Sequence, residues 1–153
     1  MQIELVSNLG ARLPKGDGPL RFGATEADAR QRLEAESPTD PPQTSRVRSG
    51  PWTWRARIGN RWIEASAGGD GLLGEIRVAR AIEPITNTMI EIPVIYRGID
   101  VFKHTMAEVE FLLGATTTSV ATTIRDLRLT GPSGYALSVT LIDPTRPNSP
   151  TPP

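Results

Sequence analysis

The stretch PWTWRARIGNRWIEAS, residues 51–66, predicts a β-hairpin. Gly59 and Asn60 are residue types that accept the positive φ angles of a two-residue hairpin turn. The runs on either side, 51–58 and 61–66, alternate between apolar and polar side chains, which is the pattern of strands with one buried face. A third alternating run follows at 74–82, so we expect an antiparallel meander.

The position of the turn determines which residues of the hairpin face each other, because side chains alternate between the two faces of a sheet. Trp54 then pairs with Ala65 on an apolar face that suits the core, and we expect Trp54 to be buried. The other face is rich in arginine and contains a tryptophan. Its members are Arg55, Arg57, Trp62 and Glu64, joined by Leu73, Glu75 and Arg77 from the third strand.

Two interpretations of this second face are open. Cross-strand pairs between Arg57 and Trp62 and between Arg55 and Glu64 would each contribute up to about 1 kcal/mol, which describes a solvated sheet face. Tryptophan and arginine are also the residues most enriched among those that dominate the energy of protein interfaces. The candidate partner-binding residues are therefore Arg55, Arg57, Trp62, Glu64 and Arg77.

Two phrases 80 residues apart in the chain share one spacing. They are GPLRFGATEADARQRL, residues 18–33, and GIDVFKHTMAEVEFLL, residues 98–113. Thr25 opens a Thr-x-x-Asp pattern and Thr105 a Thr-x-x-Glu pattern, and such a capping box begins a helix. The common register favours an internal duplication; the alternative is two unrelated helices that are both well capped.

The pattern of elements predicts an α+β fold made of two degenerate helix-plus-antiparallel-meander halves that share one core. The first half is residues 1–83, with a Pro- and Ser-rich loop at 37–50, and the second is residues 84–142. Residues 143–153 are predicted to be a disordered tail, because proline removes backbone donors and the segment has little apolar area to bury.

The second meander contains alternating runs at 124–130 and 135–142, on either side of a loop that includes residues 131–134. Residues that face each other across a hairpin must share a face. We therefore expect an odd-length loop of three or five residues that places Leu127 near Leu137 or Val139.

The first phrase, with its repeat, is similar to the opening of small bacterial helix-plus-meander modules, of which the outer-membrane assembly lipoprotein BamE and the tandem β-lactamase inhibitor protein are examples. The stretch YRGIDVF, residues 96–102, also resembles a phrase in uncharacterised actinobacterial proteins, some of them of the toxin-immunity type. The resemblance implies a helix followed by a meander in each half and carries over no site residues.

Composition excludes several classes of function. The 153 residues contain 17 Lys plus Arg and 17 Asp plus Glu, so the formal charge is zero and a broad nucleic-acid surface is not expected. Cysteine is absent, which excludes disulfides, thiolate metal sites and a cysteine nucleophile. The chain begins without a signal-peptide pattern and has no long apolar run, so we expect a cytoplasmic protein with no membrane partner.

Motifs for chemistry are weak. Residues 69–74, GDGLLG, match the dinucleotide pattern G-x-G-x-x-G, but a strand-like run follows where the phosphate site needs a helix, so a hairpin loop is the better interpretation. His104 is the only histidine, and it is expected to be an exposed residue at a helix entry. We nominate no catalytic residue, no metal ligand and no cofactor.

Three functional hypotheses follow. The first is a non-enzymatic protein-binding module, such as an immunity or inhibitor protein that acts through an exposed sheet face. The second is a small-ligand-binding or weakly catalytic α+β domain with a site between the halves. The third, single-stranded nucleic-acid binding on an aromatic sheet, lacks the basic excess that it needs.

Overall fold

The computed structural model describes residues 1–15, 18–37, 40–44, 52–80, 91–114, 116–117, 121–124, 126–131 and 134–145. These residues form two helices, α1 (Glu26–Glu36) and α2 (Met106–Leu113), and two β-sheets. The α+β class predicted from the sequence is confirmed.

The larger sheet is antiparallel and has eight strands. In spatial order these are β10 (Thr116–Thr117), β11 (Ala121–Ile124), β12 (Leu127–Thr130), β13 (Ser138–Ile142), β7 (Leu73–Arg80), β6 (Arg61–Ala67), β5 (Thr53–Ile58) and β4 (Gln43–Thr44). The smaller sheet has five, in the order β3 (Leu20–Arg21), β2 (Gly10–Arg12), β1 (Ile3–Val6), β8 (Val94–Tyr96) and β9 (Ile99–Asp100). Its β1 and β8 run parallel, which ties the start of the chain to its middle.

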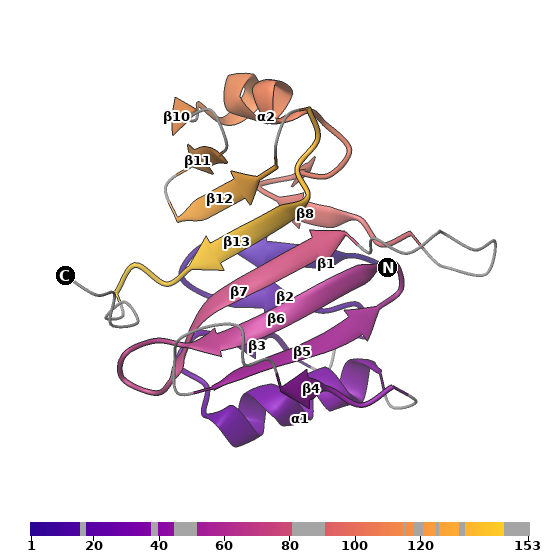
Figure 1. Ribbon diagram of the computed structural model, residues 1–153, viewed down its shortest axis with the longest axis vertical. Coiled ribbons are helices and arrows are strands. Elements are labelled where there is room, and N and C mark those ends of the chain that lie inside the picture. Colours follow the sequence, from indigo (N-terminus) through magenta and orange to yellow (C-terminus); the bar gives the residue numbers. More distant parts are fainter. Residues whose placement is uncertain are drawn as a thin grey trace.

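The two sheets are stacked, with the five-stranded sheet behind the eight-stranded one in Figure 1. Helix α1 lies beside β5 at one end of the molecule, and α2 lies beside β11 at the other. One cluster of buried side chains contains residues of both sheets and both helices, among them Leu5, Leu33, Ile63, Val109 and Leu129. The two predicted halves therefore share one core.

The larger sheet is arranged symmetrically about its centre. Each meander ends in one strand, β7 in the first half and β13 in the second, and these two strands pair with each other at the centre of the sheet. The other strands of each half lie on its own side of this central pair. The strands before the helices, β3 and β9, are the two edges of the smaller sheet. Strand β1 sits between the halves of that sheet and has no counterpart. The duplication itself stays a prediction.

Both helices begin at the predicted threonines. Thr25 Oγ1 accepts a hydrogen bond from the Asp28 amide at 3.3 Å, and Thr105 Oγ1 accepts one from the Glu108 amide at 3.2 Å. The Thr105 amide also donates to Glu108 Oε1 at 2.9 Å, which completes the capping box. This backbone hydrogen bond, followed by the contact with the Thr105 side chain, lowers the pKa of the Glu108 carboxyl.

The register of the first hairpin is the predicted one, with Arg57 opposite Trp62 and Arg55 opposite Glu64. The GDGLLG segment connects β6 to β7 and leads into a strand, as expected. One prediction is wrong: Leu73 does not lie with Glu75 and Arg77 but is fully buried. The register shifts between Ser66 and Ala67, and such a bulge turns the following residues to the other face.

The second meander differs from the prediction in two details. The run expected at 124–130 is split between β11 and β12 by a turn. The prediction of a three- or five-residue loop that places Leu127 near Leu137 or Val139 is wrong: the loop to β13 spans residues 131–137, Leu129 faces Val139 and Leu127 faces Leu141. It is longer because Ala136 turns into the core while Tyr135 forms a bridge with Thr105.

Only part of the predicted tail is described. The Asp143 amide donates to the carbonyl of Gly74, and Asp143 Oδ1 accepts from the Thr145 amide at 3.0 Å. Residues 146–153, and most of the predicted loop at 37–50, lie outside the described residues.

Gly10 is the residue whose replacement should damage the fold most. It has φ +130°, and a Cβ there would lie 2.0 Å from the carbonyl oxygen of Leu20 on the neighbouring strand. We expect Gly10→Ala to lower the free energy of unfolding by at least about 3 kcal/mol, because two backbones would have to separate. Urea denaturation measures the change. Gly71→Ala is the control, since Gly71 also has a positive φ but open space around it, and it should cost about 1–2 kcal/mol. Equal costs for the two variants would contradict the close approach.

Candidate functional site

The five candidate residues lie together on one side of the larger sheet, which we call the outer face. It is the side opposite the five-stranded sheet, and it is turned toward the viewer in Figure 1. Strand pairing arranges its side chains in rows that cross the strands. One row is Arg55, Glu64, Arg77, Thr140 and Arg128, and the next is Arg57, Trp62, Ala79, Ser138 and Thr130.

Trp62 is the centre of this arrangement. The guanidinium carbon of Arg55 lies 4.3 Å from the centroid of the indole ring, and that of Arg57 lies 5.5 Å away. Arg57 Nε also donates to the carbonyl of Gly59 at 3.2 Å. Each cation–π contact contributes about 0.5–1 kcal/mol at a partly exposed site. The half-buried indole is therefore held in place by two arginines of the neighbouring strand.

Glu64 forms its ion pair with Arg77 on β7. Arg77 Nη1 lies 3.4 Å from Glu64 Oε1, and the exposed fractions of the two side chains are 32% and 12%. A partly exposed pair of this kind contributes about 1 kcal/mol or less. The pair links β6 to β7 and leaves the remaining guanidinium donors of Arg77 for other acceptors.

Trp54 points to the opposite side of the sheet, as predicted, but it is half-buried rather than buried. Helix α1 lies over it: the indole Nε1 donates to Glu26 Oε2 at 2.9 Å, and Arg30 stands 5.6 Å from the ring centroid. The ring thus packs against the core with one edge while its NH group reaches an exposed carboxylate.

Arg61, which is buried, and Arg80, which is half-buried, form a cationic pair that the sequence analysis did not identify. They face each other across β6 and β7 on the inner side, and their guanidinium carbons lie 4.6 and 4.7 Å from the centroid of Phe102. Burial, followed by the charge of Arg80, lowers the pKa of Arg61. Arg61 Nε donates to the carbonyl of Ile92 at 2.9 Å. The signal in the sequence was the place of Arg61 on the apolar face of the hairpin.

A polar cluster joins three distant segments. Ser7 Oγ and Tyr96 Oη donate to Asp126 Oδ1 at 3.0 and 3.1 Å, and they lie 3.0 Å from each other. Tyr96 is fully buried, and Asp126 Oδ2 is buried without a hydrogen-bond partner. No local motif could reveal this cluster, because Ser7 and Asp126 are 119 residues apart. Its position indicates a clamp between the two sheets.

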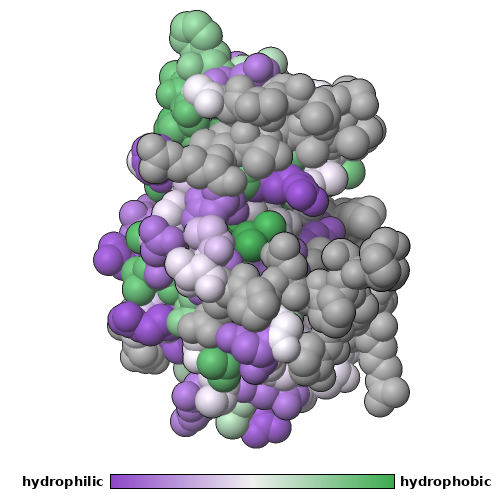
Figure 2. Space-filling model, turned by 90° about the vertical axis from the view of Figure 1, so that its left-hand side faces the viewer, coloured by the Kyte–Doolittle hydropathy of each residue, from purple (hydrophilic) through white to green (hydrophobic). Residues whose placement is uncertain are grey.

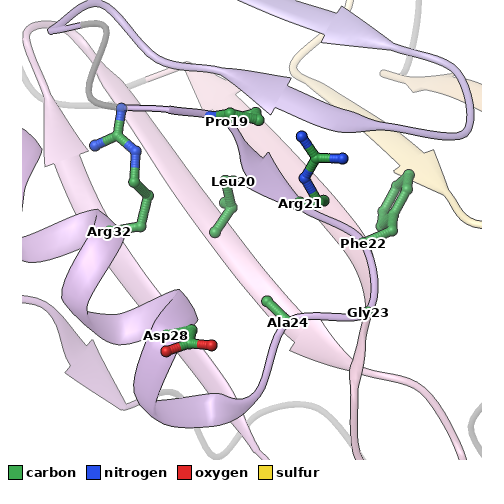
Figure 3. Close-up of a pocket in the computed structure, with 8 residues that line it drawn as sticks. All are labelled: Pro19, Leu20, Arg21, Phe22, Gly23, Ala24, Asp28 and Arg32. Carbon is green, nitrogen blue, oxygen red and sulfur yellow. The ribbon is translucent and has the colours of Figure 1, made fainter.

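A hollow of about 330 Å³ lies between β3 and α1. Figure 3 shows the residues that line it. Arg21, Asp28 and Arg32 contribute charges to its rim, and Leu20 and Ala24 lie between them. Arg32 is held by Glu36, which lies 2.9 Å from its Nη2, and donates through Nε to the carbonyl of Gly18. All lining residues belong to the first predicted half, so the hollow is not the expected site between the halves.

The end of the molecule near α2 exposes apolar surface, which Figure 2 shows as hydrophobic residues at the top. Phe111 is 88% exposed and Leu112 is 50% exposed. Exposed apolar groups of this size mark interaction surfaces more often than scattered single residues do. This surface is distinct from the outer face and was not predicted.

Within the described residues, no three His, Asp or Glu side chains are grouped to hold a metal ion. No described helix is long and apolar enough to cross a membrane. No protein-family model, curated protein or solved structure matches the chain. The resemblance to bacterial helix-plus-meander modules therefore stays a prediction, and the function must be inferred from the geometry.

The two tryptophans of the hairpin should respond differently to truncation. We expect Trp62→Ala to lower the free energy of unfolding by about 1 kcal/mol, because only cation–π contacts and partly exposed area are lost. Trp54→Ala should cost more, about 2–3 kcal/mol, because its ring packs on the core. Thermal and urea unfolding of both variants measure the difference. Unfolding on loss of Trp62 would mean that the faces are assigned the wrong way round.

The polar cluster should behave as one unit. Ser7→Ala and Tyr96→Phe should each destabilise the fold by about 1–2 kcal/mol, since each removes a hydrogen bond to a carboxylate. The double variant should differ from the sum by at least about 0.5 kcal/mol, because both hydroxyls donate to the same oxygen. A double-mutant cycle in urea checks this, and strict additivity would contradict a shared acceptor.

Proposed function

We propose that this chain is a non-enzymatic protein-binding module that acts through the outer face of its larger sheet. The observation that carries the proposal is the stacking of Arg55 and Arg57 on the ring of Trp62. Among the described residues, no helix or strand is stacked on this face (Figure 1). Tryptophan and arginine in such a position are the residue types that dominate binding energy in protein interfaces.

The rigidity of the arrangement supports binding further. Ordering a long side chain on association costs about 0.5–1.5 kcal/mol. The two arginines are already ordered, since Arg55 stacks on Trp62 and Arg57 donates to its own turn. A partner therefore meets a face whose side chains lose little freedom when it binds.

A sheet face of five or more strands is broad, so it covers a partner rather than enclosing a small molecule. An immunity or inhibitor role fits such a face, because a covered partner loses access to its own substrate. The alternative is a small-ligand-binding or weakly catalytic domain, and the hollow between β3 and α1 is the place that would serve it. Arg21 and Asp28 at its rim are exposed, whereas the side chain of Arg32 is mostly buried and its Nη1 has no hydrogen-bond partner. A deep apolar pocket would suit a small ligand better.

The test is a surface-display library of genome fragments from the source organism, sorted against the immobilised full chain. Clones that bind the immobilised wild-type chain are then sorted a second time against the immobilised Trp62→Ala variant. We expect a set of clones whose binding weakens at least about thirtyfold, which corresponds to about 2 kcal/mol. Circular dichroism confirms that the variant is folded.

Phe111→Ala is the matched control, because it also removes an exposed aromatic ring but lies on α2. Clones that bind the Trp62→Ala variant but not the Phe111→Ala variant would indicate that the interface is the α2 surface instead. The proposal would be overturned if every clone bound the Trp62→Ala variant as tightly as it binds the wild type.

A further inference from the structure

The hollow between β3 and α1 lies against an edge strand that has an unpaired backbone donor. The Phe22 amide donates to the carbonyl of Leu9, and Gly10 faces Arg21 across β2 and β3. Because an antiparallel pair forms hydrogen bonds at every second residue, the Arg21 amide points away from β2, on the side of the hollow. Among the residues that the structure describes, this amide has no acceptor. The wall of the hollow therefore offers a backbone N–H group.

Charged side chains of both signs surround the hollow without pairing with each other. Figure 3 shows Arg21 on the side of β3 and Asp28 on the side of α1, with Arg32 one turn further along the helix. In the described part of the chain, neither the Arg21 guanidinium nor the Asp28 carboxylate has an ion pair or a hydrogen bond. Asp28 is one methylene shorter than the Glu108 that completes the capping box of α2, and only its amide bonds to Thr25. Both charges are thus available to a ligand.

Arg32 is the buried charge of the hollow. Its side chain is 11% exposed, and its Nη2 lies 2.9 Å from Glu36 Oε1. Its Nε donates to the carbonyl of Gly18, whereas its Nη1 is buried and has no hydrogen-bond partner. A buried donor without an acceptor is costly, so a negative charge in the hollow near Arg32 would be stabilised. The anionic end of a ligand should therefore lie toward Arg21 and Arg32, and its cationic end toward Asp28.

The size and the charge balance of the hollow define the class of ligand. Its volume of about 330 Å³ is near the lower end of the range, about 300–1,000 Å³, that small-molecule pockets span. Strand β3 is two residues long, which is too short an edge for an added peptide strand. Arg21 and Arg32 are balanced by Asp28 and by the Glu36 that binds Arg32, so the hollow has no net charge to attract a simple anion. A small zwitterion fits both constraints.

We propose that this hollow binds a small aliphatic amino acid. Its carboxylate accepts hydrogen bonds from the amide and the guanidinium of Arg21, and its ammonium group donates to the carboxylate of Asp28. Charge-assisted hydrogen bonds of this kind are the strong ones. Leu20 and Ala24, which lie between the two charges in Figure 3, provide the apolar lining for its side chain. This site is separate from the outer face and does not depend on the function proposed for it.

The test is a titration of the isotope-labelled full chain with L-alanine, L-valine and L-leucine in turn, at millimolar concentration, followed by amide chemical shifts in NMR spectra. We expect at least one of the three to bind, with the largest shifts in residues 19–32. The tightest amino acid is then compared with its analogues that lack the amino group or the carboxylate, which for leucine are 4-methylpentanoate and 3-methylbutylamine. Each analogue should bind at least about tenfold more weakly, because one charged hydrogen bond is lost.

Two variants identify which residue binds each end of the ligand. Arg21→Gln should weaken the amino acid about tenfold and leave the amine analogue unchanged. Asp28→Asn should also weaken the amino acid about tenfold, but it should not weaken the carboxylate analogue. Arg128→Gln and Asp40→Asn are the matched controls, since they make the same charge changes at exposed positions that do not line the hollow. Both controls should bind the amino acid as the wild type does.

The proposal would be overturned if none of the three amino acids shifted the amides of residues 19–32. It would equally fail if the amino acid and its two analogues bound alike, or if neither Arg21→Gln nor Asp28→Asn weakened binding. Trp62→Ala should bind the amino acid as tightly as the wild type, because Trp62 does not line the hollow. Failure of this site and failure of the outer face are therefore distinguishable.

Discussion

The pairing of β7 with β13 is the constraint on which the rest of the structure depends. It places Val78 against Val139 and Ile76 against Leu141, so that the apolar sides of the two meanders become continuous. Without it the apolar sides of the two meanders would not be continuous, and each half would bury a smaller fraction of its surface. With it, the inner face of eight strands is broad enough to cover the five-stranded sheet. The parallel pair of β1 and β8 then joins the halves a second time.

Polar groups between the sheets make this stacking specific. The hydroxyls of Ser7 and Tyr96 meet one oxygen of Asp126, and Arg61 reaches the carbonyl of Ile92. Buried polar groups stabilise a structure only in the one arrangement that satisfies their hydrogen bonds, so they favour a single register over others. Apolar packing of Ile, Leu and Val alone discriminates less between alternative registers of the two sheets.

The same joint generates the candidate binding surface. Arg55 and Trp62 belong to the first half and Arg128 to the second, and they share a face only because β7 meets β13 in an antiparallel register. The outer face is therefore a property of the assembled sheet. Its described side chains include two arginines that stack on the indole of Trp62.

Local chemistry in the sequence determined the helix starts, the first hairpin and the faces of Trp54 and Trp62. Those features depend on residues close together in the chain, namely two capping threonines and a Gly-Asn turn, so spacing alone predicts them. The bulge that buries Leu73, the longer loop before β13, and the clamp at Asp126 came only from the tertiary structure. Each depends on contacts with segments that are distant in the sequence. Ala136 is buried in the core and Tyr135 forms a bridge with Thr105. The hydroxyls that bind Asp126 are 119 and 30 residues away from it. The row of arginines also required the fold, because no sequence spacing shows that β12 lies three strands from β6.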